Sequence, residues 1–256
     1  MKLRLLVSAC LLRLASGSCG QQEPEGHEWH PPVPNSRSPC PGLNAMANHG
    51  WLPRSGEDIS LEVLRDAVAG AFNYERTLFD RPFHEALAFN LSTTGNSSTF
   101  NLIDLAKHDA VEFDGSLSRN DFYFGDNNHF NPTIWATVSK RLRLDEAGHS
   151  KMDKYVTVEA AAKARAARVQ DAMRVNPTFN ASANQMVGSP GTTALYLTTL
   201  WDDKADAAPK AWIKAFFEEE RIPYLEGYKP EKQKTGATLL EMNERVLAVE
   251  VETGGC

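Results

Sequence analysis

The sequence lacks several features that would assign it to other classes of protein. After residue 20 it contains no run of roughly 20 apolar residues, which excludes a membrane-spanning helix in that part of the chain. It has no basic block, and Asp and Glu outnumber Lys and Arg by 33 to 27, so nucleic acid is not expected as the main partner. Alternation of period two is rare, and we find no internal repeat or flexible linker. Because 42% of the 256 residues are hydrophobic, the chain can bury a sizeable core, and we predict one all-α domain.

Cysteine is also scarce, with four residues, Cys10, Cys19, Cys40 and Cys256, which do not make a disulfide scaffold. Removal of a signal peptide would eliminate Cys10 and leave an odd number of thiols, a pattern that indicates a reactive thiol or an intermolecular bridge. Cys256 follows Thr253-Gly-Gly at the end of the sequence, and we expect it to form a disulfide-linked homodimer. The alternative is an intrachain bridge from Cys256 to Cys19.

The first residues are typical of a secretory signal. Lys2 and Arg4 precede the apolar run Leu5 to Leu14, and the small residues Ala15-Ser-Gly17 suit a cleavage site. We therefore assign residues 1–18 to a signal peptide and residues 19–256 to one domain, and we expect a secreted, extracellular protein without a membrane partner. Sequons at Asn90, Asn96 and Asn180 are candidate N-glycan sites and agree with this route.

Helix signals occur along most of the chain after residue 40. Ser60, Asn131 and Thr157 are expected N-caps, and Pro132 suits the first helical position after Asn131. Three predicted helices begin near Pro41, Leu61 and Leu102, and a fourth follows Asn131. Four more are predicted over residues 157–173, 193–201, 209–220 and 238–249.

The segment Pro39-Cys40-Pro41-Gly42-Leu43-Asn44 carries the strongest chemical signal. If Pro41 begins a helix, the backbone N–H groups of Gly42, Leu43 and Asn44 can point at the Cys40 sulfur and lower the pKa of the thiol. Such a thiolate can act as a nucleophile or as a haem iron ligand. A disulfide between Cys19 and Cys40 is the alternative from these residues alone.

Three longer segments carry a family resemblance. The segment Ser38-Pro-Cys-Pro-Gly-Leu-Asn-Ala-Met-Ala-Asn-His-Gly-Trp-Leu-Pro53 resembles the proximal segment of the haem-thiolate peroxidases, which include chloroperoxidase and the fungal unspecific peroxygenases. Leu105-Ala-Lys-His-Asp-Ala-Val-Glu-Phe-Asp-Gly-Ser-Leu-Ser-Arg119 is similar to their distal and metal-binding segment. Phe216-Phe-Glu-Glu-Glu-Arg-Ile-Pro-Tyr224, followed by Glu226-Gly227, is similar to their carboxy-terminal motif. The segments keep the family order over residues 38–228.

The resemblance implies a single globular domain of about eight helices around a buried haem b. It implies that Cys40 is the axial ligand of the haem iron, where an anionic sulfur favours O–O cleavage. It also implies a Mg²⁺ ion held by Glu112, the backbone carbonyl of Phe113, and Ser116, all of them oxygen donors. Asp114 and Arg119 are expected to support this turn. We place His108 on a helix as a packed or hydrogen-bonded residue, and His49 as a packed residue of the proximal segment.

The chain departs from the family in its acid–base residues. Short members read Glu-His-Asp in the second segment, and their histidine orients a catalytic glutamate, whereas this chain reads Glu112-Phe113-Asp114. Our alignment places Thr192 at the position of that glutamate, and Gln185 at the position of the arginine that long members use instead. No Asp or Glu occurs from residue 172 to 201, so a shift of the alignment by a few residues does not restore the glutamate. Phe113 and Thr192 are therefore the predicted, atypical distal pair.

Three functions agree with these residues. The first is a peroxygenase or peroxidase that uses hydrogen peroxide on small organic substrates, with altered peroxide activation. The second is a haem-thiolate protein that performs another reaction in secondary metabolism. The third is a secreted haem-binding protein with little turnover. The sequence favours the first, because the ligand and metal motifs are intact.

Overall fold

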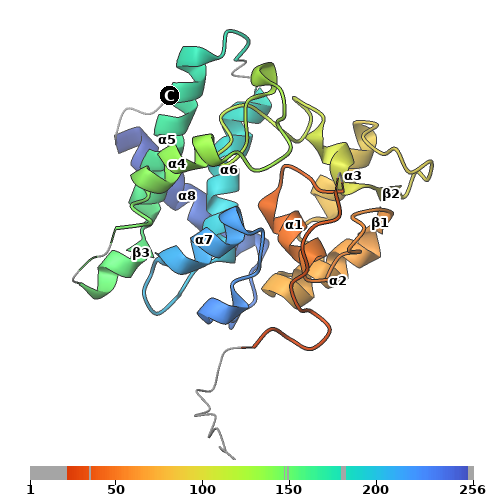
Figure 1. Cartoon of the computed structure of the whole chain (residues 1–256), viewed down its shortest axis with the longest axis horizontal. Helices are drawn as coiled ribbons and strands as arrows, with labels where there is room; N and C mark the ends of the chain where they lie inside the picture. The colour runs from red at the N-terminus through yellow and green to blue at the C-terminus, as the bar shows by residue number, and fades with distance from the viewer. Residues whose placement is uncertain (1–21, 35, 147, 149, 180–182, 253–256) are drawn as a thin grey trace, which may run out of the picture.

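The computed structural model describes residues 22–34, 36–146, 148, 150–179 and 183–252. The described chain is mostly helical, as the sequence predicts, with two small antiparallel sheets (Figure 1). Strand β1 (Ile59–Ser60) pairs with β2 (Thr99–Phe100), and β3 (Tyr155–Val156) pairs with β4 (Ala208–Pro209). The α-helices of the described chain are α1 (Pro41–Asn48), α2 (Leu61–Phe72), α3 (Asp80–Ala88), α4 (Pro132–Arg141), α5 (Val158–Val175), α6 (Ala183–Thr199), α7 (Lys210–Glu218) and α8 (Gly236–Glu252).

Three helices begin at the predicted caps. The Ser60 hydroxyl accepts a bond from the Val63 N–H, and the Thr157 hydroxyl accepts one from Ala160. Asn131 Oδ1 accepts bonds from the N–H groups of two residues in the first turn of α4, and Pro132 occupies the first position. These caps satisfy N–H groups that have no partner within the helix, so the start of each helix is encoded locally.

The structure corrects the prediction in two helical regions. Helix α6 begins at Ala183 rather than at residue 193 and continues through Pro190. A proline inside a helix removes one backbone hydrogen bond, which is why the prediction started after it. The segment Leu102–Ala106 is a short 3₁₀ helix that ends before His108, so His108 does not lie on a helix.

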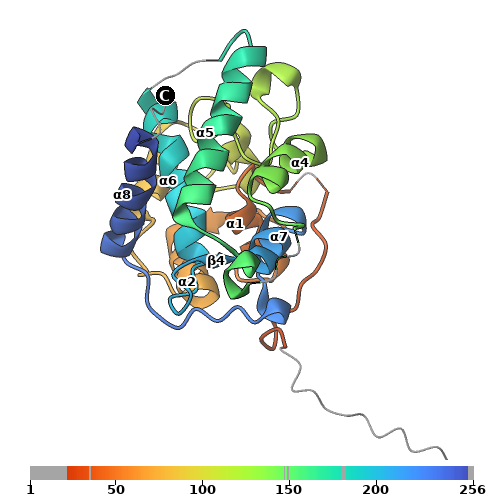
Figure 2. The ribbon, with the colours of Figure 1, turned by 90° about the vertical axis from the view of Figure 1, so that its left-hand side faces the viewer.

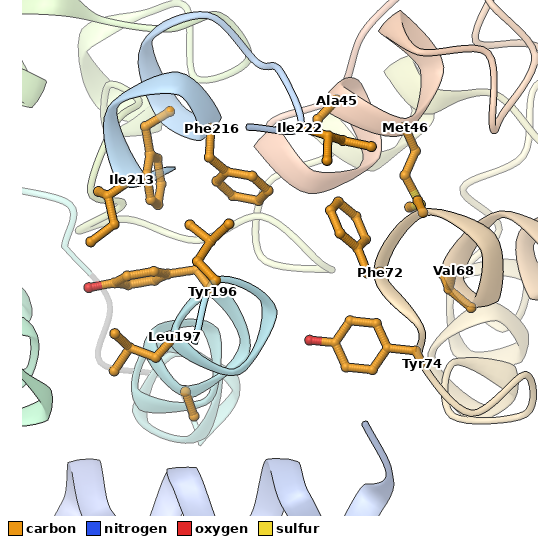
Figure 3. Close-up of a cluster of buried hydrophobic side chains, with 14 of the residues drawn as sticks. Ala45, Met46, Val68, Phe72, Tyr74, Tyr196, Leu197, Ile213, Phe216 and Ile222 are labelled. Atoms are coloured by element: carbon orange, nitrogen blue, oxygen red, sulfur yellow. The ribbon is translucent and has the colours of Figure 1, made fainter. Parts of the chain in front are cut away.

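The helices pack as two groups around a shared core. In one group α6 packs against α5 and α8, and α5 also contacts α4 (Figure 2). In the other group α1 contacts α2 and α7, and α2 contacts α3 (Figure 1). Buried side chains from α1, α2, α6 and α7 meet between the groups, among them Met46, Phe72, Leu197 and Phe216 (Figure 3). This core holds the beginning of α1, which carries Cys40, in a fixed relation to the other elements.

Several predictions fall outside the described residues, namely the signal peptide at 1–18, Cys19, Asn180 and Cys256. Asn90 and Asn96 are exposed in the connection between α3 and β2. Within the described chain, no helix combines the length and the apolar character needed to cross a membrane.

Candidate functional site

Cys40 lies at the N-cap of α1, and Pro41 occupies the first helical position. The side chain of Asn44 shapes this loop, because its Oδ1 accepts a bond of 2.9 Å from the Ser38 N–H and its Nδ2 donates one of 2.8 Å to the Ser38 carbonyl. The Ser38 hydroxyl in turn accepts a bond of 3.2 Å from the Cys40 N–H. Cys40 is a free, partly buried thiol, held at the start of a helix by hydrogen bonds that are local in sequence.

The electrostatics of Cys40 differ from the expectation. Burial raises the pKa of the Cys40 thiol more than the N–H groups of Leu43 and Gly42 lower it, and the charge of Arg119 opposes burial only weakly. The Asn44 N–H donates its hydrogen bond to the Cys40 carbonyl, at 3.2 Å, and not to the sulfur. The predicted lowering of the pKa is therefore wrong for the protein alone, because desolvation outweighs two N–H dipoles. A bound metal cation would supply the missing positive charge, since a thiol that coordinates a metal is deprotonated.

The third sequence segment packs directly against this loop. A Cβ atom added at Gly42 would lie 3.3 Å from Cζ of Phe216 and 3.8 Å from the Cys40 sulfur. Phe216, on α7, is 4% exposed and stacks edge to face with Phe72 at a centroid distance of 6.3 Å. The close approach leaves no room for a larger side chain at position 42 without displacing Phe216 or the loop.

The second segment joins the other two through Arg119. This residue is fully buried, and its guanidinium forms an ion pair with the Glu220 carboxylate that follows α7. Its Nε donates to the Asn128 carbonyl at 3.2 Å. Glu220 Oε1 also accepts a bond of 2.8 Å from Asn44 Nδ2, so the three segments quoted from the sequence converge on one buried polar network.

Glu112 provides an unsatisfied oxygen in the second segment. Its side chain is 3% exposed, and its Oε2 lies 2.9 Å from His108 Nδ1 and accepts a 2.7 Å bond from Asn127 Nδ2. Its Oε1 is buried and has no hydrogen-bond partner among the described residues. Burial raises the pKa of Glu112, although His108 and Asn127 act in the opposite direction. A buried carboxylate oxygen without a donor fits a cation ligand, because it carries the cost of desolvation uncompensated.

The turn around Glu112 is held by structural bonds. Asp114 Oδ1 accepts a bond of 2.9 Å from the Phe122 N–H, and its Oδ2 accepts one of 2.8 Å from Asn176 Nδ2, which confirms the supporting role expected for Asp114. Gly115 has a φ of +80°, and a Cβ there would lie 3.1 Å from a methyl group of Val169. The turn thus requires glycine both for its left-handed conformation and for the close approach of α5.

Ser116 is partly buried in the same turn, and its carbonyl accepts a 3.0 Å bond from Arg168 Nε. Among the described residues no group of three or more His, Cys, Asp or Glu forms a metal site. The predicted Mg²⁺ ligands include one carboxylate, so this finding leaves the assignment of Glu112, the Phe113 carbonyl and Ser116 a prediction. The unpartnered Glu112 oxygen is the observation in its favour.

Phe113 and Thr192 lie on different elements. Phe113 is partly buried in the turn after Glu112, and no described hydrogen bond or ring contact joins it to α6. Thr192 is exposed on α6, and a Cβ added at the preceding Gly191 would meet no atom within 4 Å. On the opposite face of α6, Thr193, Ala194 and Leu197 are fully buried. Gln185 is on the first part of α6, where the side chains of 183–189 lie outside the described structure.

These observations fit a haem ligated by Cys40. Cys40 offers a free thiol at a helix start, and Glu112 offers a buried oxygen without a hydrogen-bond partner among the described residues. The bound group would be held by Cys40, and Phe216 would support the loop that carries it. Haem chemistry would come from the cofactor, and the chain would supply its ligand and surroundings.

His49 is a structural residue of the proximal segment. His49 is fully buried, its Nε2 accepts a 3.1 Å bond from the Ile222 N–H, and its Nδ1 lies 2.7 Å from the His27 carbonyl, which confirms the expected packing role. Sequence reasoning missed Asn127 and Arg168, which hold the Glu112 turn from outside the motif, and no local signal identifies them. It also assigned no role to Glu220, although the quoted third segment contains that residue.

A helical fold with a free Cys40 thiol at a helix start, joined through Arg119 to the Glu112 turn, agrees with the resemblance to the haem-thiolate peroxidases. The profile of the family "Peroxidase, family 2" matches residues 27–233, and the chain belongs to this family. The chain is thus a member of an oxidoreductase family that acts on peroxide, with haem as the family cofactor.

Individual relatives agree with this assignment. The chain is 32% identical to an aromatic peroxygenase of Coprinellus radians over 60% of this chain and 62% of that protein. It is 27% identical to an aromatic peroxygenase of Cyclocybe aegerita over 78% of this chain and 57% of that protein. It is 37% identical to a chloroperoxidase of Leptoxyphium fumago over 36% of this chain and 25% of that protein. The match thus spans less than two thirds of the length of each relative.

Proposed function

We propose that this protein is a secreted haem-thiolate peroxygenase or peroxidase that uses hydrogen peroxide to oxidise small organic substrates. The free Cys40 thiol at the start of α1, in a segment shared with the family, is the observation that supports this most directly. Two relatives are named aromatic peroxygenases, which favours aromatic compounds among the substrates. The proposed cofactor is haem b, with Cys40 as its axial ligand.

The chain's own residues define how peroxide would be handled. Bound haem would supply the iron at which the peroxide O–O bond is cleaved. Cleavage also needs a proton moved between the two oxygens, a task that a positioned carboxylate performs with a rate gain of about 10²–10⁴. Thr192 would replace that carboxylate, and its hydroxyl is not a base at neutral pH, although it can donate a hydrogen bond or hold a water molecule. Phe113 would make this side apolar, so we propose altered peroxide activation.

The decisive experiment is a peroxide-driven assay on a small aromatic substrate, with haem occupancy measured in the same sample. Turnover that scales with haem occupancy supports the proposal. Full occupancy without turnover supports a haem-binding protein or a different reaction instead. Absence of haem from a folded chain reconstituted with excess haem contradicts the assignment of Cys40 as the ligand.

A second candidate is a haem-thiolate protein with another task in secondary metabolism. The absence of Asp and Glu from residues 172–201 favours it, because the usual acid–base group has no substitute on α6. The chain is also 25% identical to a protein named dothistromin biosynthesis peroxidase, from Dothistroma septosporum, over 74% of this chain and 47% of that protein. Low peroxide turnover together with tight haem binding would favour this candidate.

We further propose a Mg²⁺ ion bound by Glu112, the Phe113 carbonyl and Ser116. The double variant Glu112→Gln and Ser116→Ala should lower haem retention and thermal stability, because it removes the charged ligand and the hydroxyl ligand. Elemental analysis of purified wild-type protein should find a divalent cation near one per chain. A metal-free protein that keeps its haem would refute this site.

Other proposals concern secretion and assembly. We propose extracellular localisation after removal of residues 1–18, N-glycans at Asn90, Asn96 and Asn180, and a homodimer linked through Cys256. The exposed positions of Asn90 and Asn96 allow modification. Treatment with a glycosidase tests the glycans, and electrophoresis without reductant tests the disulfide. A Cys256–Cys19 bridge within one chain would appear as a monomer that becomes less compact when reductant is added.

A further inference from the structure

The strongest uninterpreted feature is the buried polar network behind the Cys40 loop. Its centre is Glu220, whose side chain is 15% exposed and forms an ion pair with the fully buried Arg119. Glu220 adopts a φ of +47°, in the left-handed region that favours glycine. A residue with a side chain at such an angle costs backbone free energy, so its surroundings must hold it there.

Two asparagines of α1 help to keep Glu220 in this conformation. Asn44 Nδ2 donates to Glu220 Oε1 at 2.8 Å, and Asn48 Nδ2 donates to the Glu220 carbonyl at 3.0 Å. The same Asn44 amide group bonds the Ser38 carbonyl at 2.8 Å, at the base of the loop that carries Cys40. A displacement of the Glu220 carboxylate would therefore be transmitted to the Cys40 loop through a single side chain.

Two donors converge on one oxygen of the Glu220 carboxylate. Arg119 is paired with it, and Asn44 donates to the same oxygen. A cavity of about 100 Å³ borders Glu220, Arg37 and Asn128, and the buried Oδ1 of Asn128 has no hydrogen-bond partner among the described residues. A cavity of this size that is lined in part by polar groups can hold water, which would solvate the second carboxylate oxygen.

The charged pair lies next to the loop that carries the sulfur, because Asn44 contacts both Glu220 Oε1 and the Ser38 carbonyl. A cation in this position favours a negative sulfur, and a carboxylate opposes it. Charges held in a buried setting interact more strongly than charges in water, and salt screens them little. The pair is thus placed to set the electrostatic potential at the sulfur as well as the shape of its loop.

We propose that Glu220 is a positioning residue for the Cys40 ligand, which fixes the Cys40 loop through Asn44 and, together with Arg119, sets the potential at the sulfur. This inference rests on the proposed haem-thiolate function. It gives a role to Glu220, which is not among the predicted haem ligand, metal ligands or distal pair. It also gives the third sequence segment, which contains Glu220, a role in setting the reduction potential of the iron.

The charge component is tested by the reduction potential of the haem-loaded protein. Glu220→Gln keeps an oxygen that can accept from Asn44 and Arg119 but removes the negative charge, so the midpoint potential of the iron should shift in the positive direction. Arg119→Gln should shift it in the negative direction. The double variant, which removes both charges, should return towards the wild-type value. Glu219→Gln is the matched control, because Glu219 is exposed and pairs with Arg221.

The positioning component is tested in the haem-free chain by amide hydrogen exchange. Glu220→Ala should speed exchange of the Ser38 and Cys40 amides more than Glu220→Gln does, because alanine removes one of the two acceptors of Asn44 Nδ2. Equal exchange in both variants would overturn the positioning role. Unchanged potentials in the single variants, with the thiolate spectrum intact, would overturn the charge role while leaving the proposed function standing. A wild-type chain that binds no thiolate-ligated haem would overturn the proposed function itself.

Discussion

At the scale of single residues, Cys40 illustrates how a helix start and burial compete. Two N–H groups of α1 favour a negative sulfur, yet desolvation dominates and raises the pKa of the thiol. The thiol is therefore not activated by the protein alone, and iron coordination is what would make it anionic. A thiol with a raised pKa is a poor free nucleophile, which agrees with the proposed role of Cys40 as an iron ligand.

Replacement of Cys40 tests this directly. Cys40→Ser and Cys40→His should both abolish the red-shifted Soret band that thiolate ligation gives to the reduced carbonyl complex. The measurement is the absorption spectrum of the reduced protein under carbon monoxide, with the far-ultraviolet circular dichroism spectrum as a control for folding. A variant that retained the band would show that another group ligates the iron.

The distal pair makes a second prediction at this scale. Phe113→His combined with Thr192→Glu should raise the rate of peroxide-dependent oxidation by up to about 10²–10⁴-fold, because it restores an oriented acid–base group. Thr192→Glu alone should help less, since the carboxyl group would then lack the histidine that orients it. Initial rates at fixed haem concentration provide the comparison. A wild-type rate already equal to that of the double variant would mean that another group moves the proton.

At the scale of elements, buried side chains join segments that are distant in sequence. His49 at the end of α1 bonds the backbone at Ile222 and at His27, so it links α1 to the segment after α7 and to the N-terminal segment 22–34. The Ile222 N–H is a donor, which means that Nε2 is the acceptor and the imidazole is neutral. Burial lowers the pKa of His49, although Glu23 at 3.9 Å from Nδ1 acts against this.

The neutral His49 predicts a loss of stability in acid. The pKa of His49 in the folded protein lies below its ordinary value of about 6.5, so the unfolded chain binds the proton first. The free energy of unfolding therefore falls as the pH decreases below about 6.5. His49→Gln can form similar hydrogen bonds but does not titrate, so it should lose less stability than the wild type over the same pH range. Urea unfolding between pH 7 and pH 5 measures the difference, and parallel curves would contradict the assignment. The neighbouring histidines contribute to both proteins and largely cancel.

At the scale of the whole molecule, a second buried cluster ties the two helix groups together. The Tyr74 hydroxyl lies 2.8 Å from the Thr199 hydroxyl on α6, and the Tyr228 hydroxyl donates to the Thr199 carbonyl at 3.0 Å. Lys234 Nζ donates to the Phe72 carbonyl at the end of α2, with the rings of Tyr74 and Tyr228 within 6 Å. Burial lowers the pKa of Lys234 to about 8.

Lys234 predicts a gain of stability in mild alkali. The folded protein releases the Lys234 proton near pH 8 and the unfolded chain near 10.5, so the free energy of unfolding should rise between these values, by up to about 3 kcal/mol. The wild type should gain relative to Lys234→Met from pH 8 to pH 10, as measured by chemical denaturation. Above pH 10 the buried tyrosines act in the opposite direction, because burial raises the pKa of Tyr74 and Tyr228. A difference between the two proteins that does not change with pH would contradict the lowered pKa.

The sequence by itself determined the features that depend on near neighbours. The caps at Ser60, Asn131 and Thr157 and the placement of Cys40 before Pro41 were predictable, because each involves bonds within the next few residues. The helical class followed from the spacing of apolar residues, since a helix buries one face whatever it packs against. Family membership also follows from sequence, because the three segments keep their residues and their order.

Other features depend on burial and on side chains distant in sequence, and these became clear only from the folded structure. The direction of the pKa shift at Cys40 could not be predicted, because it depends on burial of the loop and no local sequence pattern indicates that burial. The unpaired oxygen of Glu112 and the pairing of Arg119 with Glu220 arise from segments far apart in the chain. The physical reason is the separation in sequence of the groups that interact. Hydrogen bonds at a helix start join adjacent residues, whereas desolvation and buried ion pairs depend on distant side chains that folding brings together.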